Sequence, residues 1–150
     1  MKILICTDGS EHSKKAVHFA AEMVGFCNID EAAIIHVYES TPFLPDYWHS
    51  KYPFSSDEEK RLQELDKRIQ EDRKSIFADA VKLFEEKQVP LKTIFKVGHP
   101  AGAIATEAAD GKYDIVVIGR RGMSSVKNLF IGSVSSAVLQ VVKSNVLIVK

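Results

Sequence analysis

Short apolar segments alternate along this chain with longer segments of helical periodicity, and this alternation restricts the folds that the chain can adopt. The apolar segments are rich in Ile and Val with little apolar–polar alternation, which is typical of strands buried on both faces. Five strands are expected, over residues 2–7, 32–38, 91–97, 114–118 and 145–149. Alternation of strand and helix indicates an α/β domain, with an open, doubly wound parallel sheet and helices on both faces.

Four helices are predicted between these strands from the three- and four-residue spacing of apolar side chains. They cover about residues 10–24, 57–87, 100–110 and 133–143. The second has Ser56 or Asp57 as its expected N-cap, and the third begins with Pro100 and ends at Gly111. Residues 39–56 contain three prolines among several aromatic residues, so a long irregular loop is expected there.

Length and composition indicate one domain, residues 1–150, because the chain is too short for two ordinary domains. Lys plus Arg and Asp plus Glu each number 20, so no global basic field would hold nucleic acid or an anionic membrane surface. No apolar stretch reaches the roughly eighteen residues of a membrane span, and the N-terminus lacks a signal-peptide core. A cytoplasmic location is therefore expected. The two cysteines form no CxxC motif or Cys/His cluster, so two reduced thiols are expected.

A glycine-containing segment directly follows the fourth predicted strand. It consists of Gly119-Arg120-Arg121-Gly122, nine further residues, and then Gly132-Ser133-Val134-Ser135. Glycine lacks a Cβ, so backbone N–H groups can approach an anion closely, and a helix beginning at Ser133 favours negative charge. The spacing matches neither the P-loop motif GxxxxGK[ST] nor the dinucleotide-binding motif GxGxxG. We interpret the segment as a phosphate-binding loop that points to a nucleotide, with a plain tight connection as the alternative.

A second polar turn, Thr7-Asp8-Gly9-Ser10, follows the first strand. In open α/β sheets, ligands bind beyond the carboxyl ends of the strands, where the strand order reverses direction. If the first strand is central, this turn and the glycine segment converge on one site. Asp8 could then bond a ribose hydroxyl, or reach a phosphate-bound Mg²⁺ through water, because hard cations prefer oxygen ligands. The alternative role for Asp8 is to cap the first helix.

Several motifs spread over the whole chain match a known family. They are the Gly119-xx-Gly122-x9-Gly132-Ser133 spacing, Asp8 after the first strand, His36-Val37 at the end of the second strand, and Gly98-His99-Pro100. In these features the chain resembles the universal stress protein family. The resemblance implies an adenine nucleotide alpha hydrolase-like fold with strand order 3-2-1-4-5. Family members that keep the glycine motif are ATP-binding, and this sequence keeps every glycine and the serine.

Carried over residue by residue, the resemblance implies an ATP site with two ends. The adenine and ribose end would be lined by Thr7, Asp8 and Val37. Ribose and phosphates would be held by Gly119, Arg120, Gly122, Gly132, Ser133, Val134 and Ser135. ATP is the implied cofactor, and Mg²⁺ would be held through a water on Asp8. Arg120 stands where the family commonly has a small or polar residue, so its guanidinium either adds a phosphate contact or points to solvent.

Three functions are compatible with these residues. The first is an ATP-binding protein whose bound state changes its partners or its dimer, a nucleotide-dependent switch or regulator in the stress response. The second is a slow ATP hydrolase, for which Asp8 and His12 are the only candidates to position water. The third is a dimeric adaptor that does not use nucleotide. The first is favoured, and no catalytic residue is assigned, because phosphate donors are present without an evident base and its orienting partner.

The last predicted strand, residues 145–149, would leave an apolar edge on the sheet, and such edges invite pairing with another chain. In the universal stress protein family the equivalent strands pair across a two-fold axis, so the resemblance implies a homodimer through this strand. The aromatic segment 43–54 is expected to pack on itself. Alternatively, this segment packs over the nucleotide, lies in a dimer interface or binds a partner protein.

Overall fold

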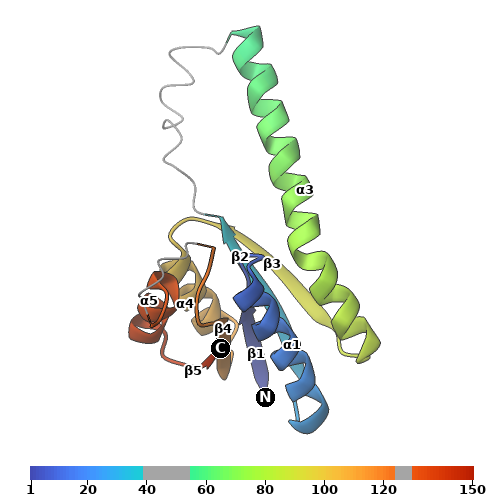
Figure 1. Cartoon of the computed structure of the whole chain (residues 1–150), viewed down its shortest axis with the longest axis vertical. Helices are drawn as coiled ribbons and strands as arrows, with labels where there is room; N and C mark the ends of the chain where they lie inside the picture. The colour runs from blue at the N-terminus through green and yellow to red at the C-terminus, as the bar shows by residue number, and fades with distance from the viewer. Residues whose placement is uncertain (39–54, 124–129) are drawn as a thin grey trace.

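The computed structural model describes residues 1–38, 55–123 and 130–150, so the predicted aromatic segment 43–54 lies outside the described residues. Strands and helices alternate along the described chain (Figure 1). The strands are β1 (Lys2–Cys6), β2 (Glu31–Tyr38), β3 (Leu91–Val97), β4 (Ile115–Gly119) and β5 (Asn145–Val149). The helices are α1 (Glu11–Phe26), α3 (Ser56–Glu86), α4 (Pro100–Asp110) and α5 (Ser133–Val141). A search of the described helices finds no segment with the length and hydropathy of a membrane span.

The strands form one parallel sheet of order β3-β2-β1-β4-β5, which confirms the predicted fold and strand order. In this register Cys6 at the end of central β1 lies opposite Ile35 on β2 and Ile118 on β4. The carboxyl ends of these three strands therefore meet at one edge of the sheet. The strand order reverses direction between β1 and β4, which makes this edge the expected place for a ligand.

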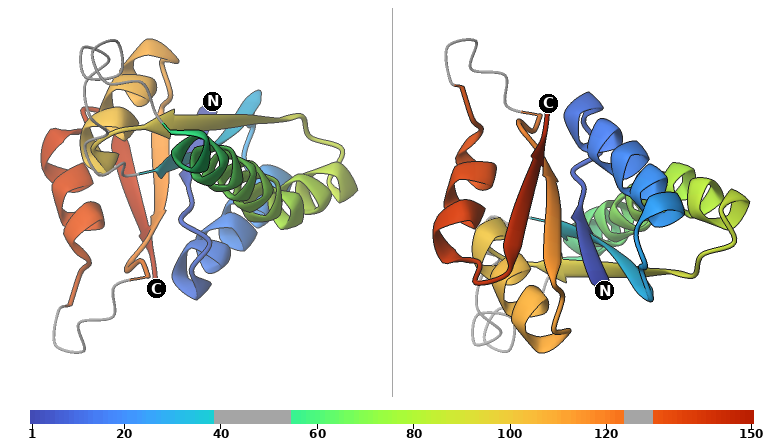
Figure 2. Two further views of the ribbon diagram at one scale, coloured as in Figure 1. Left: turned by 90° about the horizontal axis from the view of Figure 1, so that it is seen from above. Right: turned by 90° about the horizontal axis from the view of Figure 1, so that it is seen from below.

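Helices cover both faces of the sheet, with α1 and α3 on one face and α4 and α5 on the other (Figure 2). Side chains of β1 alternate between the two layers, as the pleat of a strand requires. Ile3 and Ile5 belong to the core under α1 and α3, whereas Leu4 and Cys6 belong to the core under α4 and α5. All four side chains are buried, which explains why β1 is apolar without alternation.

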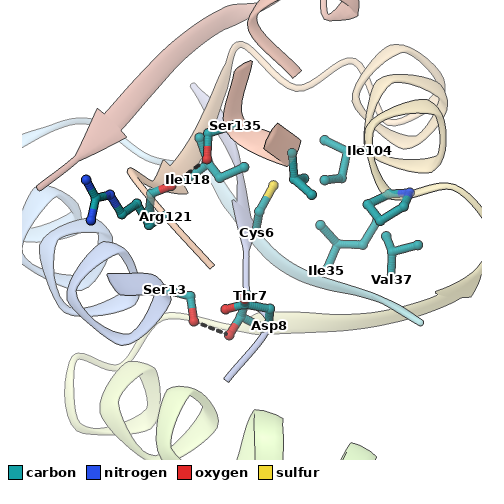
Figure 3. A pocket seen from close by; sticks show the side chains of 13 residues that line it. Cys6, Thr7, Asp8, Ser13, Ile35, Val37, Ile104, Ile118, Arg121 and Ser135 are labelled. Atoms are coloured by element: carbon teal, nitrogen blue, oxygen red, sulfur yellow. Dashed lines mark hydrogen bonds between the residues drawn. The ribbon is translucent and has the colours of Figure 1, made fainter. Parts of the chain in front are cut away.

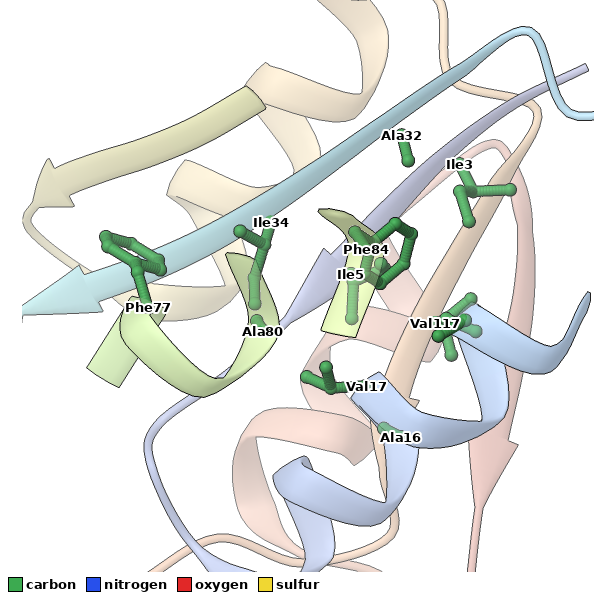
Figure 4. Packing of buried hydrophobic residues seen from close by; sticks show 12 residues of the cluster. Ile3, Ile5, Ala16, Val17, Ala32, Ile34, Phe77, Ala80, Phe84 and Val117 are labelled. Carbon is green, nitrogen blue, oxygen red and sulfur yellow. The ribbon is translucent and has the colours of Figure 1, made fainter. Parts of the chain in front are cut away.

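Helix α3 is long, and its second half packs on the sheet. Phe77, Ala80 and Phe84 are buried in the core beneath it (Figure 4), whereas the first half extends beyond the sheet (Figure 1). The helix has a capping box, in which the Ser55 hydroxyl accepts from the Glu58 amide and the Glu58 carboxylate accepts from the Ser55 amide. The predicted N-caps, Ser56 and Asp57, were therefore wrong by one or two residues, because the sequence pattern did not single out this reciprocal pair.

Two other helix ends differ slightly from expectation. Helix α1 continues through Gly25 to Phe26, because a glycine weakens a helix without having to end it. Helix α5 ends at Val141 and the next residue is extended, since the chain must turn into β5. The Ser144 hydroxyl fixes that turn by donating to the carbonyl oxygen of Tyr113 at 2.7 Å.

Candidate functional site

A cavity lies at the carboxyl ends of β1, β2 and β4, where the polar turn after β1 and the segment after β4 come together (Figure 3). Apolar side chains from β2, β4 and α4 form one part of its lining, and polar groups from the two loops, α1 and α5 form the other. The lining residues are Cys6, Thr7, Asp8, Ser13, Ile35, Val37, Pro100, Ile104, Ile118, Gly119, Arg121, Val134 and Ser135. An apolar wall beside a few convergent polar groups is the usual composition of a small-molecule site.

The structure brings most of the predicted site residues to this cavity. Those that line it are Thr7, Asp8, Val37, Gly119, Val134 and Ser135. Those that do not line it are Arg120, Gly122, Gly132 and Ser133. All four of these belong to the segment between β4 and α5 or to the first residue of α5, so they border the cavity along the chain without forming its wall.

Asp8 connects the two loops of the site. Its Oδ1 accepts a hydrogen bond from the Ser10 amide and its Oδ2 accepts one from the Met123 amide, both at 3.0 Å. Burial acts to raise the pKa of Asp8, but hydrogen bonds from Ser10, Ser13 and Met123 outweigh it and hold that pKa below its usual value. The N-cap of α1 is Ser10, whose hydroxyl accepts from the Ser13 amide. Asp8 therefore clasps the β4–α5 segment, and we call its bond to Met123 the Asp8 clasp.

The glycines of the motif permit close packing between the loops. A Cβ on Gly119 would lie 2.6 Å from the backbone oxygen of His12 in α1. A Cβ on Gly122 would lie 2.4 Å from Oδ2 of Asp8. Gly132 is less crowded, because its Cβ would meet no atom closer than 3.2 Å. Two of the three glycines thus bring the β4–α5 segment against α1 and Asp8, a role that the sequence motif alone did not reveal.

The N-terminus of α5 lies beside the cavity. Its N-cap is Gly132, and among the described residues no side chain caps the first turn. Ser135 is buried, and its hydroxyl donates to the carbonyl oxygen of Gly119 at 2.8 Å, whereas Ser133 is exposed. The Ser135 oxygen keeps its acceptor capacity, but its proton is engaged within the protein. The first-turn amides of α5 remain as donors for an anion.

The two adjacent arginines of the motif point to different places. Arg121 lines the cavity, although the sequence did not include it among the site residues. The guanidinium of Arg120 lies over the ring of Phe130, 6.0 Å from its centroid, and the ammonium of Lys150 lies at the same distance from that ring. Arg121 therefore lines the cavity, but its guanidinium points away from the other labelled lining side chains (Figure 3), whereas Arg120 contributes to a cation–π cluster at the end of the sheet.

The remaining polar groups of the cavity indicate neither a nucleophile nor a metal cage. Cys6 is buried, and burial raises the pKa of its thiol to about 12, so the thiol stays protonated and unreactive. In the described ranges, no group of three or more His, Cys, Asp or Glu side chains could hold a metal ion. Among the described residues of the lining, Asp8 is the one carboxylate.

Several lining residues were missed by sequence reasoning. Ile35 shares a strand face with Val37, so alternation along β2 could have identified it. Ile118 precedes Gly119 directly and could have been found from the end of β4. Pro100 and Ile104 belong to α4, and no pattern in the sequence says how this helix approaches the cavity.

Comparison with known proteins decides the family. The model of the universal stress protein family matches residues 1–150, the whole chain. The chain belongs to the universal stress protein family. It is 28% identical over 158 residues to the universal stress protein YxiE of Bacillus subtilis, covering 99% of this chain and 98% of the relative. It is 31% identical over 149 residues to a universal stress protein of Thermus aquaticus, covering 99% and 97%.

Solved structures of other universal stress proteins share the fold. That of MJ0577 from Methanocaldococcus jannaschii is 26% identical and has a TM-score of 0.77, over 99% of this chain and 94% of that one. A universal stress protein of Archaeoglobus fulgidus, solved in complex with dAMP, has a TM-score of 0.63 at 16% identity, over 100% and 98% of the chains. One from Arabidopsis thaliana, solved with AMP bound, has a TM-score of 0.62 at 18% identity, over 100% and 91%.

Proposed function

We propose that this universal stress protein binds an adenine nucleotide, specifically ATP, in the cavity between β1 and β4. The observation that carries the proposal is the N-terminus of α5, which no side chain of the described residues caps, beside a cavity with an apolar wall. Such a site offers apolar contact to a base at one end and backbone donors to phosphates at the other. The relatives from Archaeoglobus fulgidus and Arabidopsis thaliana bind dAMP and AMP, which supports an adenine nucleotide here.

In this proposal the two ends of the cavity bind different parts of the nucleotide. Val37 and Ile35 from β2, with Ile104 from α4, contact the adenine ring, and Thr7 and Asp8 lie towards the ribose. The phosphates lie along the β4–α5 segment, where the backbone amides of Gly122, Ser133, Val134 and Ser135 would donate. The Gly132 amide already donates to the carbonyl oxygen of Arg120, so Gly132 serves as the N-cap and not as a donor. Neither arginine side chain is placed on the phosphates, because the guanidinium of Arg121 points away from the cavity (Figure 3) and that of Arg120 lies over Phe130.

The residues present fit a nucleotide-bound Mg²⁺ better than a resident metal. Mg²⁺ usually keeps several waters and binds through one or two carboxylates together with substrate phosphates. Asp8 is the single carboxylate among the described lining residues, and both its oxygens already accept hydrogen bonds from backbone amides. We propose that Asp8 holds the cation through water, so that Mg²⁺ binds together with ATP and not before it.

The geometry favours a nucleotide-dependent switch over an efficient hydrolase. A general base must accept a proton near neutral pH, but hydrogen bonds hold the pKa of Asp8 below its usual value. The Cys6 thiol, with its pKa raised to about 12, is no nucleophile. We propose that bound ATP acts as a regulatory ligand, in a cytoplasmic protein, by altering the surface around the β4–α5 segment.

A thermal-shift experiment tests the proposal. The chain is heated with ATP, ADP, AMP or FMN, each with and without Mg²⁺. ATP at a hundred times its dissociation constant should stabilise the protein by about 2.7 kcal/mol. Gly122→Val should abolish that shift, and wild-type protein should release no phosphate from ATP over hours. Absence of a shift with every adenine nucleotide would leave the adaptor function, and rapid phosphate release would establish the hydrolase.

We also propose that the protein is a homodimer through β5. In the described part of the sheet this strand pairs with β4 alone, so one of its edges is unpaired. The residues of β5 are only partly buried, and Leu139 and Val141 on neighbouring α5 are 44% and 50% exposed. Pairing of two such edges would satisfy backbone groups and cover apolar side chains at once.

A further inference from the structure

His36 lies outside the cavity lining but contacts the turn that carries Asp8. Its Nδ1 is 2.8 Å from the carbonyl oxygen of Thr7. A carbonyl oxygen only accepts hydrogen bonds, so Nδ1 carries a proton and donates it. The imidazole also packs against Phe95 on β3, with ring centroids 5.7 Å apart and planes inclined by 37°. This packing orients the ring so that Nδ1 faces Thr7.

Strand β2 holds Thr7 through both of its backbone groups. The Thr7 amide donates to the carbonyl oxygen of Ile35 at 2.9 Å, and the Thr7 carbonyl accepts from His36. Because β1 ends at Cys6, Thr7 is the first residue beyond the strand. The bond to His36 thus replaces the backbone bond that a longer strand would provide at this carbonyl.

The Thr7 carbonyl that His36 holds belongs to the peptide bond between Thr7 and Asp8. Both carboxylate oxygens of Asp8 depend on the orientation of this peptide, since one accepts from Ser10 and the other from Met123 in the distant β4–α5 segment. A rotation of the Thr7–Asp8 peptide would move the carboxylate away from Met123. The hydrogen bond from β2 therefore acts on the segment that follows β4, although His36 itself is not among the residues that line the cavity.

We infer that His36 is a positioning residue of this site: by donating to the Thr7 carbonyl, its Nδ1–H sets the Thr7–Asp8 peptide so that Asp8 can clasp the β4–α5 segment. The effect of His36 on nucleotide affinity rests on the proposed function, whereas its effect on the clasp does not. His36 contributes no contact to the nucleotide itself.

A matched pair of variants separates the hydrogen bond from the packing. His36→Leu keeps an apolar side chain against Phe95 but removes the donor, whereas His36→Asn keeps an N–H near the position of Nδ1. Amide hydrogen exchange is followed at Ser10 and Met123, the two donors to Asp8, and at Val117 in buried β4 as a measure of global opening.

In His36→Leu, exchange at Met123 and Ser10 should accelerate about fivefold, the change expected for one lost hydrogen bond, while Val117 keeps its rate. In His36→Asn all three rates should stay within about twofold of wild type. Unchanged exchange at Met123 in His36→Leu overturns the inference, whatever the nucleotide does. Equal acceleration at Val117 also overturns it, because His36 would then stabilise only the fold.

Nucleotide affinity is measured on the same proteins by calorimetric titration with ATP and Mg²⁺. His36→Leu should weaken binding about fivefold in the wild-type background and less than about twofold in an Asp8→Ala background, because Asp8→Ala removes the acceptor of the clasp on which His36 is proposed to act. If His36→Leu instead weakens binding about fivefold in both backgrounds, His36 does not act through Asp8. If wild-type protein binds no nucleotide, the proposed function fails, and the exchange rates still decide the role of His36.

Discussion

At the scale of single residues, Gly119 and Gly122 are needed for different reasons. A Cβ on Gly119 would collide with backbone atoms of α1, and a helix backbone yields only if the whole helix moves. A Cβ on Gly122 would collide with the end of the Asp8 side chain, which can rotate away at the expense of the clasp. One glycine therefore secures the fold, and the other secures the arrangement of the site.

This difference predicts that two alanine substitutions affect stability to different extents. Gly119→Ala should lower the free energy of unfolding by about 2–3 kcal/mol, because overpacking against backbone is costly. Gly122→Ala should lower it by about 1 kcal/mol or less, since one partly exposed hydrogen bond is lost, yet it should weaken ATP binding. Urea unfolding and ATP titration measure the two effects. A larger loss of stability in Gly122→Ala than in Gly119→Ala would contradict this assignment.

Asp8 should make stability depend on acidity. Its pKa in the folded protein is held below the usual value, so the unfolded chain binds the proton more tightly. The stabilisation from Asp8 is then complete above about pH 4, the usual range of an aspartate, and is lost as the pH falls through the lower folded-state pKa. Urea unfolding of wild type and Asp8→Asn should show a stability difference that shrinks below about pH 4. A constant difference down to pH 2 would rule out this linkage.

At the scale of secondary structure, α3 is attached to the sheet through its second half. Phe84 is completely buried in the core under α1 and α3, so Phe84→Ala should lower the free energy of unfolding by about 3–5 kcal/mol. The neighbouring Glu85 is exposed, and Glu85→Ala should change stability by less than about 0.5 kcal/mol. Urea unfolding measures the free energy of unfolding of both variants. Similar effects of the two substitutions would mean that α3 does not pack as described.

Most elements could be predicted from the sequence because their signals are local. β3 and β5 have the predicted bounds, and α4 begins at Pro100 and is followed by Gly111, as expected. Local signals fail where two of them compete. At the start of α3, three adjacent residues can all act as caps, and the choice depends on a reciprocal bond to Glu58 that no single residue predicts.

At the scale of the whole molecule, the unpaired edge of β5 predicts dimerisation. Size-exclusion chromatography with light scattering should give twice the 16.7 kDa mass of one chain at micromolar concentration. Val141→Lys, at a half-exposed position four residues before β5, should weaken the dimer by placing charge beside the edge. Val97→Lys is the matched control, since Val97 is also exposed but lies on β3 at the opposite edge. A wild-type monomer, or dissociation by Val97→Lys alone, would refute pairing through β5.

The sequence by itself determined the alternation of strands and helices, the order of the sheet through the family resemblance, and the approximate place of the site. These follow from periodicity and motif spacing, which act over a few residues. Only the tertiary structure decided that Arg121 and not Arg120 lines the cavity, that Gly122 lies against Asp8, and that His36 holds Thr7. Such contacts join distant parts of the chain, so they depend on strand register and helix packing, which no short segment of sequence specifies.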